Sequence, residues 1–218
     1  MSFKGFPFVG KGVLNFRAVG NAHVFHYVLN EKLAKFTHDY PEIHLELVVE
    51  DRFIDIVAER FDAGIRLGHH VAKDMVAVRI SEELQMCTAA SPDYLAKYGM
   101  PKTPYDLMEH ECLIHRLPTS GGNMVWEFCN PKAKKHIVKI QPQGRLKTNQ
   151  GFLHKNYAVN GLGILWTPQD VIRQEIDSGK LVPILQDWNM SYEGYYLYYP
   201  NRRQDSPLFR ALVEALRM

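Results

Sequence analysis

The sequence FDAGIRLG at residues 61–68 predicts a buried strand of a parallel sheet, from Ala63 to Leu67. The run is short, mostly apolar and closed by Gly68, as in strands that helices cover on both faces. Another strand, MVAVRI, is predicted at residues 75–80, and SPD at residues 91–93 predicts a helix start with a capping hydroxyl, a proline and a carboxylate. Strand ends beside helix starts hold small molecules in α/β proteins, so this stretch predicts a ligand site rather than a catalytic centre.

Strand and helix patterns alternate along the rest of the chain. The helix starts share one device, a hydroxyl residue followed by proline, at Ser91-Pro92, Thr167-Pro168 and Ser206-Pro207. An apolar stripe at helical spacing runs from Phe25 to Tyr40 and ends at Pro41. Strands are predicted at residues 12–19, 43–49, 113–116, 125–129, 136–140, 145–147, 163–166 and 195–199, and further helices at 53–60, 151–160 and 207–217. This order predicts an α/β protein with two sheet-forming halves, the first of them beginning with a βαβαβ unit.

Composition narrows the function classes. The chain has 218 residues, of which 46% are hydrophobic, and its 26 Lys and Arg nearly balance its 24 Asp and Glu. A tight nucleic-acid binder would be more basic, so this chain alone is not expected to grip DNA. Three cysteines without metal-type spacing (Cys87, Cys112 and Cys129) suit a reducing compartment. Because the start lacks a signal-peptide core and no apolar run reaches membrane length, we expect a cytoplasmic protein without membrane contact.

Taken in order, these segments resemble the effector-binding half of LysR-type transcriptional regulators from about Gly12 to Arg217. The matching stretches are FDAGIRLG, VAVR, AASPDYL, DLMEHECL, WEF, NGLGI, GKLV and YYPNRRQDSP. The resemblance implies two Rossmann-like subdomains joined by two crossover strands, a type-2 periplasmic-binding-protein-like fold. Subdomain I would comprise residues 12–84 and 188–218 and subdomain II residues 85–187, with crossovers near residues 83–88 and 182–188. Two connections permit a hinge that a ligand closes.

The resemblance also implies partners. Members of the family bind DNA through an N-terminal winged helix-turn-helix, and nothing of that kind precedes Gly12. We therefore expect an excised regulatory domain, with residues 1–11 as a linker remnant or an expression tail. The alternative is an unusual protein that lacks the DNA-binding domain. In the family, the helix that carries Phe25, Leu29, Leu33 and Phe36 pairs with a second copy, which implies a homodimer or homotetramer.

The predicted site residues lie where strands end. The turn at Asn21, Ala22 and His23 would offer side chains and helix N–H groups to an anionic effector, although Asn21 also suits a cap alone. Arg116 could bind a carboxylate through two parallel N–H groups, and the alternative is a surface salt bridge. Trp126 is expected in the core, although an aromatic side chain that lines the cleft is the alternative. The full set of predicted effector contacts is Asn21, Ala22, His23, Leu67, Gly68, His69, His115, Arg116, Trp126, Thr148 and Asn149.

The prediction is an effector-sensing regulatory domain that binds a small, anionic metabolite between its two halves. The alternative is a solute-binding protein of a transport system, which would share the architecture. An enzyme is not expected, because the Ser120 region lacks the G-x-S-x-G spacing and Gly161-Leu162-Gly163 lacks the third glycine of a dinucleotide fingerprint. No cofactor is predicted. Ordinary loop histidines are favoured over a metal site at His69-His70, because adjacent side chains diverge.

Overall fold

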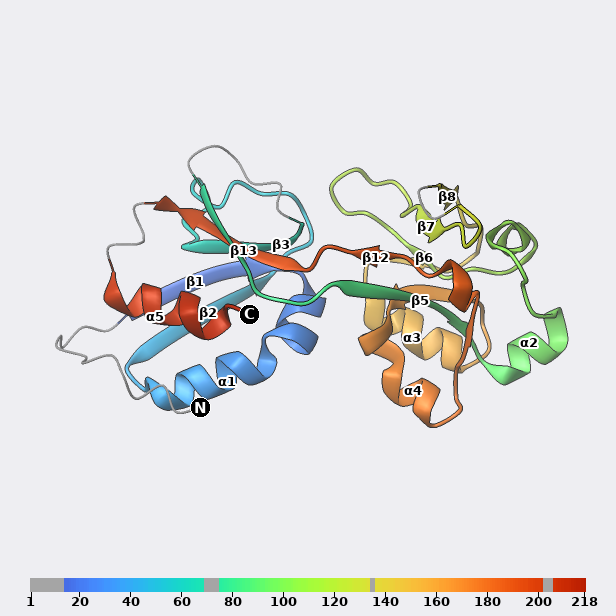
Figure 1. The fold of residues 1–218 in the computed structure, drawn as a ribbon, viewed down its shortest axis with the longest axis horizontal. Helices are drawn as coiled ribbons and strands as arrows, with labels where there is room; N and C mark the ends of the chain where they lie inside the picture. The colour runs from blue at the N-terminus through green and yellow to red at the C-terminus, as the bar shows by residue number, and fades with distance from the viewer. Residues whose placement is uncertain (1–13, 69–74, 134–135, 202–205) are drawn as a thin grey trace. The chain divides into compact units, whose positions relative to one another are not determined.

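The computed structural model describes residues 14–68, 75–133, 136–201 and 206–218 (Figure 1). The chain divides into two compact units. Unit 1 is the chain up to Glu83 together with Glu193–Met218, and unit 2 is Leu84–Tyr192. Both units contain helices and strands.

Unit 1 is built on a five-stranded sheet in the order β2-β1-β3-β13-β4. Strand β1 pairs in parallel with both β2 and β3, whereas β13 runs antiparallel between β3 and β4. A segment from the C-terminal part of the chain therefore completes the sheet. The strands are β1 (Leu14–Gly20), β2 (Ile43–Val49), β3 (Ala63–Leu67), β4 (Met75–Arg79) and β13 (Tyr195–Pro200).

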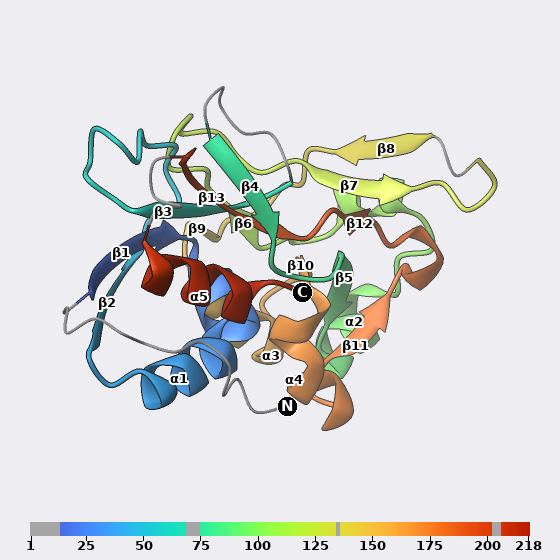
Figure 2. The same cartoon turned by 60° about the vertical axis from the view of Figure 1, so that its left-hand side comes forward.

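Two helices, α1 (Asn30–Asp39) and α5 (Pro207–Leu216), lie side by side against this sheet (Figure 2). The Lys32 ammonium group of α1 donates to the Leu216 carbonyl of α5 over 2.8 Å. The Phe209 ring of α5 packs on the rings of Phe16 in β1 and Tyr199 in β13, at centroid distances of 5.7 and 4.8 Å. The apolar stripes of both helices are thus buried and contribute to the core of unit 1, as their amphipathic patterns predict.

The predicted helix that starts near Phe25 is in fact two helices of different kinds. A π-helix, η1 (Val24–Val28), precedes α1, and the Leu29 amide donates to the Val24 carbonyl, five residues back, over 2.9 Å. The wider turn keeps Leu29, Leu33 and Phe36 all buried in the core. Apolar spacing alone does not distinguish the two helix types, and π turns are frequent at functional sites.

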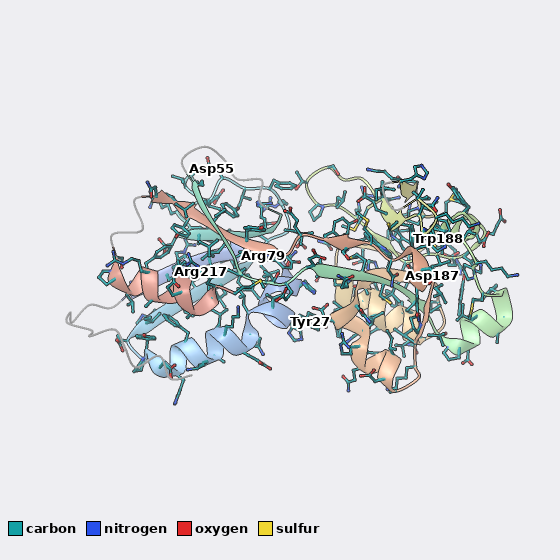
Figure 3. All side chains as sticks on the ribbon, in the orientation of Figure 1. Tyr27, Asp55, Arg79, Asp187, Trp188 and Arg217 are labelled. Carbon is teal, nitrogen blue, oxygen red and sulfur yellow. The ribbon has the colours of Figure 1, made fainter. Side chains whose placement is uncertain are left out.

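The predicted helix at residues 53–60 is a turn. The Asp55 carboxylate, labelled in Figure 3, accepts from the Val57 and Ala58 amides, and the segment then ends at Arg60, which has a left-handed φ of 60°. The Phe61 amide closes it on the Ile56 carbonyl over 2.7 Å. The Asp55 side chain thus caps the start of the turn, and the left-handed Arg60 ends it after a single turn.

The described residues of unit 2 form three small sheets. The largest follows the order β10-β5-β11, with β12 also paired to β5. A parallel pair joins β6 to β9, and an antiparallel pair joins β7 to β8. The strands are β5 (Leu84–Ala90), β6 (Ile114–His115), β7 (Trp126–Cys129), β8 (Ile137–Ile140), β9 (Lys147–Thr148), β10 (Leu165–Pro168), β11 (Val182–Ile184) and β12 (Ser191–Tyr192). The helices are α2 (Pro92–Tyr98), α3 (Gly151–Val159) and α4 (Arg173–Asp177), with 3-10 turns η2 (Pro104–Glu109), η3 (Gln169–Ile172) and η4 (Gln186–Trp188).

Two of the three predicted helix starts are confirmed. The Ser91 hydroxyl accepts from the Tyr94 amide, and the Ser206 hydroxyl accepts from the Phe209 amide. Thr167 and Pro168 instead end strand β10, with Thr167 opposite Cys87, and the helical turns begin after them. Strand pairing has overridden a local helix signal there.

The second crossing between the units lies later in the chain than predicted. Residues 182–188 lie within unit 2, where Val182 pairs with Ala90 and Ile184 with Thr88 of β5. The chain leaves unit 2 only after Tyr192, because β12 also pairs with β5, at Gln85 and Leu84. The first crossing, between Glu83 and Leu84, lies at the start of β5.

Gly144 tests the packing of unit 2. A Cβ at this position would lie 1.9 Å from the Cys112 carbonyl oxygen, which is backbone and unable to rotate away. Gly144→Ala should destabilise the protein by about 3 kcal/mol or more, as expected of severe overpacking. Gly151, with nothing within 4 Å of its added Cβ, provides the control, and Gly151→Ala at the start of α3 should be neutral or slightly stabilising. Urea unfolding measures both, and equal midpoints for the two variants would contradict this packing.

Candidate functional site

In unit 1 the predicted site residues lie at one edge of the sheet. Strands β1 and β3 are parallel, so their carboxyl ends share an edge, where Asn21 follows β1 and Gly68 follows β3. Strand β13 begins at that edge, because Tyr195 pairs with Leu67. The carboxyl ends of parallel strands are the usual ligand positions of α/β proteins.

Asn21 makes two hydrogen bonds there. Its side-chain oxygen accepts from the Val24 amide over 2.9 Å, which caps the helix start. Its side-chain nitrogen donates to the Tyr195 hydroxyl over 3.1 Å. The cap predicted from the sequence is thus present, and the same side chain also holds a buried tyrosine.

His23 lies against two aromatic rings. Its Nδ1 is 3.0 Å from the Tyr195 hydroxyl, and its ring stacks with those of Tyr195 and Tyr27 at centroid distances of 5.6 and 5.3 Å. Tyr27 is 38% exposed and projects from η1 (Figure 3). Ala22, between Asn21 and His23, is exposed. Sequence reasoning missed both tyrosines, because neither lies within the turn that carries Asn21.

We call the residues that follow β1 and β3 at this sheet edge the rim of unit 1. Its remaining members, Leu67 and Gly68, lie at the end of β3. Gly68 has a φ of 77°, a left-handed conformation that favours glycine, and its amide donates to the Gly194 carbonyl over 3.1 Å. Leu67 is exposed beside it. His69 and His70 lie outside the described residues, so the predictions made for them have no structural counterpart here.

In unit 2 the predicted residues gather at the ends of β6 and β9. His115 pairs with Thr148 in these parallel strands, and the Arg116 amide donates to the Thr148 carbonyl over 3.0 Å. The Thr148 hydroxyl accepts from the Gln150 amide, and Asn149 is exposed between them. Helix α3 starts directly afterwards without a side-chain cap. Its first amides thus present the positive end of the helix dipole.

The Arg116 guanidinium is exposed at this edge. It lies over a tight hairpin in which the Leu117 amide donates to the Gly122 carbonyl and the Met124 amide to the His115 carbonyl, each over 2.8 Å. Gly121 beneath it has a φ of 68° and leaves room for the side chain. Within the part of the chain that the structure describes, Arg116 forms no ion pair. The surface salt bridge considered as its alternative role is therefore not seen there.

A buried histidine, His154 of α3, supports the end of β6. Its Nε2 is 3.1 Å from the Ile114 carbonyl oxygen, and its ring meets that of His115 edge-on at 5.8 Å. Burial, helped by the nearby His115, lowers the pKa of His154 to about 4. The neutral ring therefore donates its Nε2 proton to that carbonyl. Sequence reasoning missed this residue, since a lone histidine in a helix gives no sign of its burial.

Trp126 lies in the core of unit 2 rather than at the rim. It is 1% exposed and stacks on Trp166 at a centroid distance of 6.2 Å. Its position is that of a packing residue, the role that the sequence favoured for it.

Three further properties of the described residues concern metal binding, thiol reactivity and membrane-spanning helices. They contain no group of three or more His, Cys, Asp or Glu side chains placed to hold a metal ion. Burial raises the pKa of the Cys87 thiol to about 11 and that of Cys112 to about 12, which leaves both unreactive. No helix within the described ranges is both long and apolar enough to span a bilayer.

The low pKa of His154 links stability to pH. Its folded pKa of about 4 lies below the ordinary value of 6.5, so its contribution is complete above 6.5 and is lost as pH falls toward 4. The loss should reach about 2–3 kcal/mol. His154→Gln, which keeps a donor but does not titrate, should flatten the decline in unfolding free energy between pH 6.5 and 4 relative to the parent. The exposed His44→Gln should retain the parent slope, and a parent slope in His154→Gln would refute the assignment.

Sequence comparisons relate the chain to transcriptional regulators. A Pseudomonas aeruginosa PAO1 protein that carries the name of a transcriptional regulator is 40% identical over 195 residues, which are 89% of this chain and 63% of that protein. The HTH-type transcriptional regulator PgrR of Escherichia coli K12 is 32% identical over 195 residues, covering 89% of this chain and 64% of PgrR. The chain thus spans about three fifths of these relatives. They lend no support to the transport alternative.

Solved structures share the fold. The regulatory domain of AphB from Vibrio vulnificus superposes with a TM-score of 0.79 at 24% identity, covering 93% of this chain and 97% of that domain. The α/β fold class predicted from the sequence, that of the type-2 periplasmic binding proteins, is confirmed by this likeness. The sequence model of the family named LysR substrate binding domain matches residues 11–218. The chain therefore belongs to the family of LysR substrate-binding domains, as the sequence resemblance predicted.

Proposed function

We propose that this chain is the effector-sensing part of a LysR-type transcriptional regulator and that it binds a small anionic metabolite. The observation that carries the anionic preference is the Arg116 guanidinium, which has no ion-pair partner among the described residues. The Arg116 backbone is bonded to Thr148, which shortly precedes the start of α3, a helix without a side-chain cap. An arginine offers two parallel N–H donors to a carboxylate, and a helix start adds free amides and a positive dipole.

The effector would contact both units. In unit 2 we propose His115, Arg116, Thr148 and Asn149 as contacts, because β6 and β9 bring their ends together. In unit 1 the proposed contacts follow β1 and β3, and they are Asn21, Ala22, His23, Leu67, Gly68 and His69. The buried Trp126 is left out of this set.

The two crossings between the units permit a hinge motion whose equilibrium a ligand could shift. The chain passes between units after Glu83 and again after Tyr192, and two such connections permit hinge motion. A ligand shifts such an equilibrium only by its difference in affinity for the two states, and moving it from 1:99 to 99:1 takes about 5.5 kcal/mol.

In the whole regulator, DNA would be bound by an N-terminal helix-turn-helix, as the HTH-type names of the relatives suggest. Effector binding would then alter promoter contacts through a rearranged oligomer. We propose a cytoplasmic site of action without membrane contact, which suits the buried thiols of Cys87 and Cys112. The relatives are regulators rather than enzymes, and we propose that the bound effector is not turned over.

A thermal-shift screen tests the anionic preference. The panel comprises amino acids, aromatic acids and small carboxylates, each with an uncharged amide analogue. A ligand at a hundred times its dissociation constant should add about 2.7 kcal/mol, a rise in melting temperature of roughly 5–10 °C for a chain of this size. Arg116→Ala should abolish that rise, whereas Arg173→Ala, which removes an exposed arginine from α4, should keep it. A hit that survives Arg116→Ala, or an amide that binds as well as its acid, would contradict the proposal.

We also propose a homodimer or homotetramer. Strand β2 leaves Leu47 and Val49 exposed at the sheet edge, and the outward face of α1 carries the exposed Ala34. Sedimentation velocity should give at least twice the 25.2 kDa chain mass. Ala34→Glu should shift the protein toward monomer, while Ala96→Glu, an exposed alanine of α2, should not. A monomeric parent protein would overturn this assignment.

A further inference from the structure

Tyr195 is attached through its backbone to the first crossing between the units. It begins β13, shortly after the second crossing. Its amide donates to the Ser81 hydroxyl over 2.7 Å, and its carbonyl accepts from the Ile80 amide over 2.9 Å. The preceding Gly194 packs so closely that an added Cβ would lie 2.2 Å from the Glu82 carbonyl oxygen. The two crossing segments therefore lie side by side at Tyr195.

The side chain of Tyr195 reaches the helix start that carries Asn21 and His23. The residue is only 2% exposed, and its hydroxyl is 3.1 Å from Asn21 Nδ2 and 3.0 Å from His23 Nδ1. One residue thus contacts both crossing segments and the rim at which effector contact is proposed.

The Val24 amide fixes the orientation of the Asn21 side chain in this group. The Val24 amide can only donate, so the Asn21 atom that it meets is the oxygen, and the other atom is the NH₂ group. Asn21 therefore donates to the Tyr195 oxygen. The tyrosine hydroxyl keeps its own hydrogen, which it can donate to His23 Nδ1. When it does so, His23 carries its proton on Nε2.

We propose that Tyr195 is a positioning residue that couples the Asn21–His23 rim to both crossing segments. This inference rests on the proposed function, in which Asn21 and His23 contact the effector. An effector group that hydrogen-bonds to Asn21 or His23 changes the bonds available to the Tyr195 hydroxyl. Because Tyr195 is buried and bonded through its amide to Ser81, a shift of its ring is transmitted to the crossing segments. A change at Ser81 must likewise reach His23.

Nitrogen-15 NMR of the histidine rings measures this coupling without any effector, since ring-nitrogen shifts distinguish the two tautomers. His23 is assigned by the loss of its signals in His23→Gln. In the parent protein we expect the tautomer protonated on Nε2. Tyr195→Phe keeps the ring but removes the hydroxyl, and Ser81→Ala removes the partner of the Tyr195 amide at a distance from the imidazole.

Matched controls accompany these variants. Tyr199→Phe removes the hydroxyl of another buried tyrosine in the same strand. That hydroxyl makes no hydrogen bond among the described residues. Ser81→Thr retains an acceptor for the Tyr195 amide. Thermal melting of each variant establishes that it is folded, and the serine pair still tests the coupling if Tyr195→Phe fails to fold.

The expected result is loss of the single His23 tautomer in Tyr195→Phe and a shift of the His23 signals in the same direction in Ser81→Ala. Ser81→Thr should restore the parent spectrum, and Tyr199→Phe should leave it unchanged. Unaltered His23 signals in Ser81→Ala would overturn the coupling, as would equal changes in Tyr195→Phe and Tyr199→Phe. Since no ligand enters this experiment, it can fail while effector binding holds, and the thermal-shift screen can fail while it succeeds.

Discussion

The antiparallel strand β13 between β3 and β4 is the constraint on which the rest of the structure depends. A sheet with a strand missing from this position would leave two rows of backbone N–H and C=O groups unpaired, which is costly in a core. The strand that fills the gap comes from the far end of the chain, after all of unit 2. The chain must therefore cross between the units twice. Both crossings, and the hinge proposed from them, follow from this one pairing.

The same strand brings Tyr195 to the edge where β1 and β3 end. Its hydroxyl satisfies Asn21 and contacts His23, so the polar groups of the unit 1 rim are largely engaged with one another. In unit 2, Arg116 has no acidic partner among the described residues and α3 starts without a side-chain cap. The two rims thus suit different roles. Under the proposed function, the positive groups of unit 2 would attract the anion, and binding would perturb the hydrogen-bond network of unit 1.

Helix type and helix extent were harder to predict than the presence of an element. Ser91 and Ser206 cap their helices as predicted, because the cap is made within one turn of the chain. Thr167 carries the same signal but lies in β10, where pairing with β5 outweighs it. The helix predicted at residues 53–60 is a single turn, because the left-handed Arg60 ends it soon after the Asp55 cap. The π-helix at Val24–Val28 shares its apolar spacing with an ordinary helix start.

The sequence by itself determined the α/β class, most strands, the rim positions at Asn21 and Arg116, and the family. These depend on periodicity, on caps and on motif order, all of which are encoded over a few neighbouring residues. Only the tertiary structure placed Tyr195 on Asn21 and His23, buried His154 under Ile114, and left Arg116 unpaired among the described residues. Tyr195 and Asn21 are 174 positions apart in the chain. Burial and long-range pairing arise from how distant segments pack, and a local pattern contains no information about its eventual neighbours.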